Sequence, residues 1–252
     1  MLRSKKLLAL LILLTFALSL IAHLPASLAL KWLPSQVPLR LTGVSGSVWQ
    51  GQASHAQWRQ YSLGAVRWDV QASQIFLGRI EAKVRVNDPQ LGAHVKGVVG
   101  YGFGGAYAKQ VIGSMPAKSA MQFARMPIPV DLAGQVELSM QRISYHAGQC
   151  QSSPGSLVWN SSQIHSPLGE LTLGTIMGKV QCQGNKWTMS ANQNNGQLSG
   201  EVSANGQMSG RATWKGWLKP GAEFPAPLLP QLQFLGRPDN QGRFHFSGQG
   251  YL

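Results

Sequence analysis

Acidic residues are scarce in this 252-residue chain, which limits the catalytic chemistry it can support. Only nine Asp and Glu residues occur, spread from Asp69 to Asp239, so a paired-carboxylate mechanism has few groups to use. The six histidines are isolated, and none has the spacing that would place two metal ligands on one face. A G-x-S-x-G elbow, a Walker loop and a dinucleotide fingerprint in a βαβ context are all absent. The sequence therefore predicts a protein that is not an enzyme and has no metal or cofactor site.

Cysteine is also scarce, since Cys150 and Cys182 are the whole complement. In an oxidising compartment, an even pair within one body is most simply a disulfide. Such a bridge would stabilise the fold by about 3 to 4 kcal/mol in the chain-entropy description. Two free, buried thiols are the alternative. Neither cysteine has His or Cys neighbours at metal-ligand spacing, so zinc is not predicted.

Long apolar runs are missing except at the start of the chain, where residues 7–22 read LLALLILLTFALSLIA. Extended through Leu30, this segment can cross a hydrocarbon core of about 30 Å. We predict a transmembrane anchor at 7–30. The alternative is a cleaved signal peptide, because Ser27-Leu-Ala29 has the small-residue spacing that a signal peptidase accepts.

Positive charge, by contrast, is abundant. The formal net charge is +13, and it falls to +10 when Arg3, Lys5 and Lys6 are set aside. Those three residues hold the N-terminus, 1–6, in the cytoplasm, so the body crosses the membrane. The other basic residues are scattered, with no aromatic stacking platform between them. We therefore predict a solvated basic surface beside an anionic membrane and no nucleic-acid partner.

After the anchor, Pro34 and Pro38 favour an extended linker at 31–40, and the remainder, 41–252, is β-rich. The passage 41–53 has closely spaced glycines among β-formers, as expected where a strand bends or bulges. Trp49 would be its large packed side chain, and Trp49→Ala would then cost about 3 to 5 kcal/mol. An exposed Trp49 would instead be a contact residue.

Alternation of apolar and polar residues predicts the strands. The cleanest strand, 79–86, places Ile80, Ala82, Val84 and Val86 on one face and Arg79, Glu81, Lys83 and Arg85 on the other. At 65–70, Val66, Trp68 and Val70 oppose Ala65, Arg67 and Asp69. Further strands are expected at 93–99, 136–139, 171–173, 179–183, 187–191, 198–203, 210–214 and 243–247. Turns are expected at Gly184-Asn185, Asn195-Gly196 and Asn205-Gly206.

Short strands without long amphipathic helices predict an all-β fold. The sheet would be mostly antiparallel and open, as a half-barrel or groove, after one N-terminal transmembrane helix. Residues 100–105 are expected to form a flexible turn, and 118–125 one or two helical turns. Residues 224–235 would form either a short helix after Pro230 that plugs an open end of the sheet or a loop that contacts a partner. The plug is favoured because this segment is rich in leucine.

One passage carries a family resemblance: Gly43-Val-Ser-Gly46-Ser-Val-Trp49-Gln-Gly51 follows the predicted anchor, with Arg67-Trp68 and Leu77-Gly-Arg79 after it. In this respect the chain resembles protein N of the bacterial type II (general) secretion pathway. That family combines one membrane anchor with a periplasmic β-rich domain that opens with G-x-x-G-[TS]-[VL]-W-x-G. Ser47 stands where Thr is common. The family positions, expected to be structural, are Gly43, Gly46, Trp49, Gly51, Arg67 and Trp68.

The resemblance implies an accessory, non-enzymatic part of the machine that exports folded proteins across the outer membrane. It implies a single-pass protein of the bacterial inner membrane with a periplasmic body that acts through protein–protein contacts. The expected partners are other type II secretion components, namely the inner-membrane assembly, with the secretin as a further candidate. A different hypothesis follows from half-buried strands beside an anchor: an AsmA-like periplasmic β-groove that binds or transfers lipid.

Overall fold

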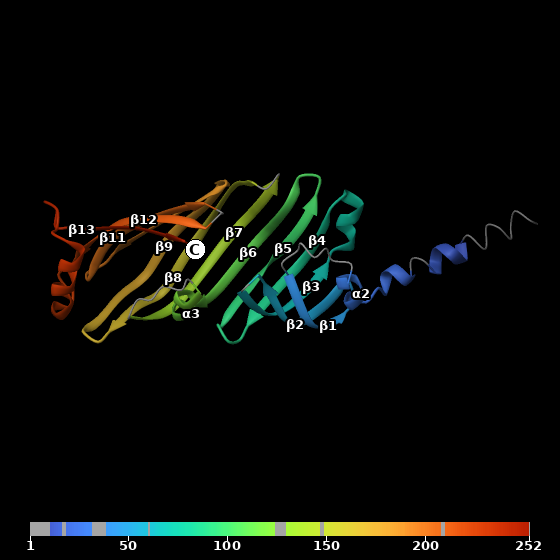
Figure 1. Ribbon diagram of the computed structural model, residues 1–252, viewed down its shortest axis with the longest axis horizontal. Coiled ribbons are helices and arrows are strands. Elements are labelled where there is room, and N and C mark those ends of the chain that lie inside the picture. The colour runs from blue at the N-terminus through green and yellow to red at the C-terminus, as the bar shows by residue number, and fades with distance from the viewer. Residues whose placement is uncertain are drawn as a thin grey trace, which may run out of the picture. The chain divides into compact units, whose positions relative to one another are not determined.

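A computed structural model describes residues 11–16, 19–31, 39–59, 61–123, 130–146, 149–207 and 210–251 (Figure 1). The chain divides into two compact units, Met1–Asp88 and Pro89–Leu252. The predicted cytoplasmic N-terminus and most of the predicted linker lie outside the described residues. All-β, antiparallel architecture is confirmed, because every strand in each unit pairs antiparallel with its neighbour in the chain.

The first unit is a four-stranded antiparallel meander. The passage 41–53 is a hairpin and not one bent strand, since it divides between two strands that turn at 47–49. The strand predicted at 65–70 is confirmed within a longer one. In chain order, the elements are α2 (Ala26–Lys31), β1 (Leu39–Gly46), β2 (Gln50–Trp58), β3 (Tyr61–Val70), η1 (Ala72–Leu77) and β4 (Ile80–Asp88).

The predicted faces of β4 are right along most of the strand and wrong at its start. Lys83 and Arg85 are exposed as expected, but Ile80 is 60 % exposed and Glu81 only 5 %. The ladder with β3 reaches only as far as the pair of Val70 with Ala82, so Ile80 lies beyond it. Alternation predicts burial only where a neighbouring strand is present to create two faces.

The second unit holds nine strands, with each paired to the next (Figure 1). The strands predicted at 171–173 and 179–183 are one strand, and two strands, β6 and β8, were not predicted. The strands are β5 (Ala93–Gly102), β6 (Gly105–Pro116), β7 (Asp131–His146), β8 (Gln149–Ser166), β9 (Gly169–Gly184), β10 (Lys186–Asn194), β11 (Leu198–Gln207), β12 (Arg211–Pro220) and β13 (Phe244–Tyr251).

Turn predictions from Gly/Asn pairs are confirmed twice and wrong once. Gly184-Asn185 joins β9 to β10, and Asn195-Gly196 joins β10 to β11. Asn205-Gly206 instead lies inside β11, where Gly206 pairs with Trp187 of β10. A Cβ placed on Gly206 would lie 2.5 Å from Cε2 of that indole. This glycine is therefore present to accommodate a ring, not to form a turn.

The same arrangement recurs in both units: an aromatic ring lies over the glycine directly opposite it on the neighbouring strand. Aromatic side chains placed this way shield the exposed backbone of a glycine and contribute cross-strand contacts. At each site an added Cβ would come within 3 Å of the ring. The pairs are Trp68 with Gly51, Tyr107 with Gly100, Trp187 with Gly206, Phe246 with Gly216 and Trp214 with Gly248.

Two short helical segments flank strands of the second unit. The predicted turns at 118–125 correspond to α3 (Ala117–Phe123), and residues 124–125 lie outside the described residues. The segment η2 (Ala226–Leu235) starts before Pro230, earlier than predicted. Leu232 is buried in η2, but Phe234 is 86 % exposed. The segment is thus packed on one side, as a plug would be, and also presents apolar side chains to solvent.

Residues 11–16 and 19–22 are helical, whereas residues 7–10, 17 and 18 of the predicted anchor lie outside the described residues. In the part of the chain that the structure describes, no helix has both the length and the apolar character needed to cross a membrane.

Candidate functional site: the glycine–tryptophan corner

Most of the family motif forms a tight corner between β1 and β2, which we call the motif corner: Gly46, Trp49, Gly51 and Trp68. Gly46 and Gly51 are the last pair of the β1–β2 ladder. Gly46 has φ 90°, and a Cβ there would lie 2.5 Å from the carbonyl oxygen of Gln50. The turn closes with a hydrogen bond of 2.8 Å from the Ser47 amide to that same oxygen. Only glycine fits position 46 without strain.

Trp68 of β3 holds the turn from the neighbouring strand. Its ring lies against Gly51, where a Cβ would overlap the indole. Its Nε1–H donates to the carbonyl oxygen of Val48 at 3.2 Å. A buried indole normally needs an acceptor for its N–H, and the turn backbone supplies one. Gly51 and Trp68 therefore act together as a lock on residues 47–49.

Trp49, unlike Trp68, binds the segment that precedes the sheet. Its Nε1–H donates to the carbonyl oxygen of Ile21 at 2.9 Å, which is in the last turn of the helical residues 19–22. Carbonyls in the last turn of a helix have no partner within the helix, and Ile21 O accepts from this indole as well as from the Leu24 amide at 3.3 Å. The Val48 amide donates to Leu24 O at 3.0 Å, so two neighbouring residues of the turn bind this segment.

Residues just beyond the helix complete this contact. Pro25 forms an isolated antiparallel bridge with Ser47, and Ala26, the first residue of α2, is only 3 % exposed. The motif corner thus holds residues 21–26 against the β1–β2 turn through the Trp49 indole and backbone groups. Residue types alone could not reveal this contact, because its acceptors are main-chain carbonyls with no signature in the sequence.

The predicted site residues do not all meet here. Trp49 is half-buried and not a core side chain, which lowers the cost expected for its removal. Gly43 has φ 63° and lies farther along β1, opposite Ser54, whose Oγ–H donates to Thr42 O at 3.0 Å. Arg67 is exposed and alternates with Trp68, so its side chain lies on the opposite face of β3.

The two cysteines lie together on adjacent strands of the second unit. Cys150 of β8 and Cys182 of β9 are 1 % and 6 % exposed, their Cα atoms are 6.0 Å apart and their sulfur atoms are at disulfide distance. The β8–β9 register shifts between Cys150 and Ser153. Sequence reasoning paired these residues from their compartment, and the structure adds that the pair joins neighbouring strands.

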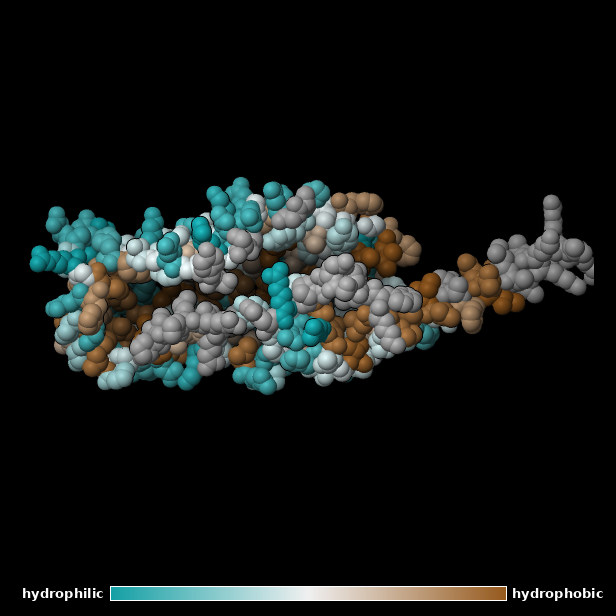
Figure 2. Space-filling model, in the orientation of Figure 1, coloured by the Kyte–Doolittle hydropathy of each residue, from teal (hydrophilic) through white to brown (hydrophobic). Residues whose placement is uncertain are grey.

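One face of the second unit is apolar across all nine strands. A single row of mutually paired residues crosses from β5 to β13, and every member is aliphatic, aromatic or glycine. Figure 2 shows brown, apolar side chains lining a hollow over these strands. The row is Val95, Gly113, Leu138, Leu157, Gly178, Ala191, Val202, Gly216 and Phe246.

The opposite face carries hydroxyls and lysines. The row next to the apolar one runs from β7 to β13 through Ser139, Ser156, Lys179, Ser190, Ser203, Lys215 and Ser247. Among the described residues, no group of three or more His, Cys, Asp or Glu could hold a metal ion.

Comparison with known proteins shows which family this chain is similar to. A family profile described as type II secretion system (T2SS), protein N, matches residues 38–247. The type II secretion system protein N of Vibrio cholerae serotype O1 is 39 % identical over 237 residues, which are 93 % of each chain. That of Aeromonas hydrophila is 31 % identical over 253 residues, 99 % of this chain and 100 % of the relative.

The protein N of Pectobacterium carotovorum is 26 % identical over 242 residues, 95 % of this chain and 94 % of the relative. No solved structure matches. The profile covers the motif corner, the cysteine pair and the apolar row together. The chain belongs to the type II secretion system protein N family.

Proposed function

We propose that this chain is a non-enzymatic accessory component of the type II secretion system. In this proposal, residues 7–30 anchor it in the bacterial inner membrane, with residues 1–6 in the cytoplasm, and the β-rich body works in the periplasm through protein contacts. Its partners are other secretion components, namely the inner-membrane assembly and the secretin.

The observation that carries this proposal is the contact between the family motif and residues 21–26. These residues lie in the C-terminal part of the proposed anchor, 7–30. Trp49 and Val48 bind main-chain carbonyls of Ile21 and Leu24 at 2.9 and 3.0 Å. A sheet held this closely to the end of an anchor would stay at a fixed height beside the membrane, which suits a scaffold. The resemblance to named secretion proteins supplies the pathway.

Gene deletion and in-cell crosslinking test the role. Deletion should reduce release of type II exoproteins while delivery of proteins to the periplasm stays normal. Crosslinking the anchored protein, with mass spectrometric identification of captured partners, should recover secretion components. Normal exoprotein release, together with no secretion component among the captured proteins, would contradict the proposal.

We also propose that Cys150 and Cys182 form a disulfide in the periplasm. Their Cα separation of 6.0 Å is the usual one for such a bridge, and the compartment is oxidising. Thiol alkylation of the unfolded protein, with and without prior reduction, distinguishes the bridge from two free thiols. Full alkylation without reductant would exclude the bridge.

A second candidate function, lipid binding, is favoured by the apolar row of the second unit. The members of this row are half-buried, apart from the buried Gly178, and contiguous apolar side chains that stay partly open to solvent generally mark an interaction site. Native mass spectrometry of the protein should then show co-purified phospholipid or lipopolysaccharide. Met189→Glu places a charge on the apolar face and should abolish the bound lipid, whereas Ser190→Glu, one residue along β10 on the polar face, should not. Equal lipid content in both variants would count against the groove.

A further inference from the structure

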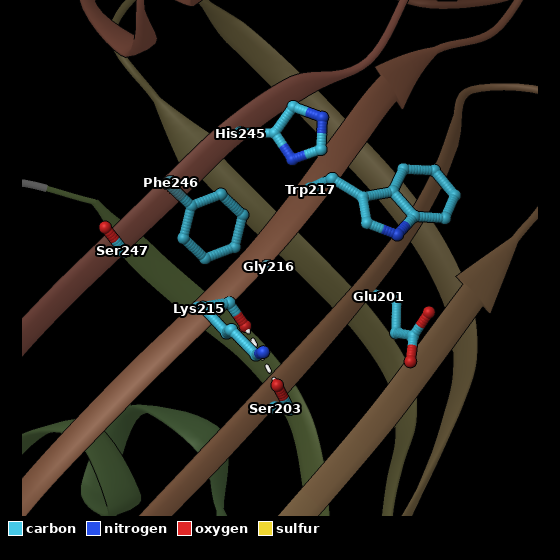
Figure 3. Close-up of a pocket in the computed structure, with 8 residues that line it drawn as sticks. All are labelled: Glu201, Ser203, Lys215, Gly216, Trp217, His245, Phe246 and Ser247. Carbon is cyan, nitrogen blue, oxygen red and sulfur yellow. Dashed lines mark hydrogen bonds between the residues drawn. The ribbon is translucent and has the colours of Figure 1, made fainter. Parts of the chain in front are cut away.

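A pocket on the polar face of β11–β13 is not explained by the secretion role or by lipid binding. It has a volume of about 450 Å³ and is open to solvent (Figure 3). Strand register places Glu201, Trp217 and His245 in one row across its floor. Ser203, Lys215 and Ser247 form the next row; Figure 3 marks the hydrogen bond from Ser203 Oγ to Lys215 O.

The pocket continues along the same three strands. A second hollow of about 460 Å³ shares Lys215 and Ser247 with the first and adds the side chains of Asn205, Thr213 and Gln249. The two hollows together form an elongated polar depression, and each step of two residues along a strand brings a new hydroxyl, amide or charged group to it.

One edge of the depression is held in place by a carboxylate. Asp239 Oδ2 accepts hydrogen bonds from Arg243 Nε at 2.8 Å and from His245 Nε2 at 2.9 Å. Its Oδ1 accepts from the amides of Gln241 and Arg243 at 2.8 and 3.0 Å. The Arg243 guanidinium lies 5.4 Å from the centre of the Trp217 ring. The side chains beside Trp217 are thus positioned before any ligand arrives.

The charges of the site narrow the class of ligand. Lys215 and Glu201 line the pocket, and Arg243 and Asp239 form an ion pair beside it, so the site has no excess charge with which to select a polyanion. Charged, hydroxyl and imidazole side chains are interspersed with the apolar surface of the lining, whereas an acyl chain needs an apolar lining throughout. The lining thus combines two large aromatic residues, Trp217 and Phe246, with several hydrogen-bonding groups. A sugar ring matches that combination, because it has an apolar face of C–H bonds and an edge of hydroxyls.

We propose that this face of the second unit binds a saccharide chain. Trp217 packs against the C–H face of one sugar. Glu201, Lys215 and the free ring nitrogen of His245 exchange hydrogen bonds with its hydroxyls, and the adjoining hollow receives the next sugar. Two envelope materials share this chemistry, the glycan strands of the cell wall and the core saccharide of lipopolysaccharide.

Binding of purified saccharides to the full-length protein in detergent tests this proposal. The probes are soluble cell-wall glycan strands stripped of their peptides and, separately, the deacylated core saccharide of lipopolysaccharide. Calorimetry should detect binding of one of them, which identifies the source. Trp217→Ala should weaken that binding at least tenfold, and Glu201→Gln, at an exposed position that leaves the sheet intact, should also weaken it.

The matched control is Trp58→Ala, since Trp58 is an exposed tryptophan of the first unit and its loss should leave saccharide binding unchanged. Binding of neither probe would overturn the proposal, as would equal binding by the wild type and the Glu201→Gln variant. In that case the row of Glu201, Trp217 and His245 would serve only to stabilise the sheet. Exoprotein release is not the readout, so failure here leaves the secretion role intact.

Discussion

The motif corner of the first unit and the apolar row of the second use the same device for different ends. In both, a tryptophan ring covers a glycine on the neighbouring strand: Trp68 covers Gly51, and Trp187 covers Gly206. In the corner, the indole N–H also ties down the turn that binds residues 21–26. In the second unit, the rings of Trp187, Trp214 and Phe246 belong to a continuous apolar face. Ring–glycine pairs therefore stabilise the sheet in both units. The motif corner differs from the second unit because its residues also form hydrogen bonds with the backbone of connecting segments.

The largest effect is expected from the cysteines, which act only on the second unit. Replacing both Cys150 and Cys182 with Ser should lower the free energy of unfolding by about 3 to 4 kcal/mol, the value expected for closing a loop of this length. Denaturant unfolding under non-reducing conditions measures it. The control is the wild type with reductant, which should match the double variant. Hydrogen exchange should speed up in β8 and β9 while the motif corner keeps its protection. Equal loss in the corner would show that the two units unfold together.

The next largest effect is expected when a methyl group is added to a glycine that lies beneath an aromatic ring. Gly206→Ala should cost about 1 to 3 kcal/mol, because the new Cβ would overlap the Trp187 indole and a packed sheet has little room to relax. Gly104→Ala, where nothing lies within 4 Å of the added Cβ, is the matched control. Thermal melts of the two variants test this. A Gly206→Ala melt equal to that of Gly104→Ala would mean that the ring can move aside.

The same substitution in the corner sharpens the comparison. Gly51→Ala would meet Trp68 and also approach the carbonyl oxygen of Ser45 at 2.9 Å, so it should destabilise at least as much as Gly206→Ala. A milder effect at Gly51 would indicate that the corner is the more deformable of the two regions.

A smaller effect is expected at Trp49, because its ring is half-buried. Trp49→Phe keeps most of the ring and removes the N–H that binds Ile21 O, so it should cost about 1 kcal/mol. Trp49→Ala should cost about 2 kcal/mol. Limited proteolysis near residues 21–26 should become faster in both variants. Unchanged cleavage would separate Trp49 from the docking of that segment, and Arg67→Ala, on the opposite face of β3, should behave as the wild type does.

Much of this architecture could be predicted from sequence, for physical reasons that also explain the failures. Alternation predicted β4 and β10 because a sheet with one apolar and one polar face imposes a period of two. It missed β8, where Ser and Gln positions obscure the period. The pairing of Cys150 with Cys182 stays a prediction, and the structure brings the two residues together on adjacent strands, of which β8 was not predicted.

The site was predictable only in part. The closely spaced glycines of 41–53 indicated irregular backbone, but they were interpreted as a bend in one strand and not as the turn between β1 and β2. The partners of Trp49 and Trp68 are main-chain carbonyls, which any residue carries, so their positions depend on tertiary structure. For the same reason Asn205-Gly206 was taken for a turn: the ring above it comes from a different strand.

The smallest effect on stability is expected when the pH is lowered. This effect should differ between a variant on the polar face of the second unit and one on its apolar face. Hydrogen bonds from His245, and from the backbone and side chain of Arg243, hold the pKa of the Asp239 carboxyl well below its usual range. Because the folded pKa is depressed, the ionised carboxylate stabilises the fold above its unfolded value of about 3.9, and this contribution is lost as the pH falls below that value. The gap in melting temperature between wild type and Asp239→Asn should therefore shrink as the pH is lowered from about 5 towards about 2.

The matched variant for the apolar face is Met189→Ala, which truncates a half-buried apolar side chain and removes no titrating group. The difference in melting temperature between Met189→Ala and the wild type should stay the same over that pH range. A constant gap for Asp239→Asn as well would show that the carboxylate contributes little to folding. The positions of the side chains beside Trp217 would then be fixed by the strands alone, as they are on the apolar face.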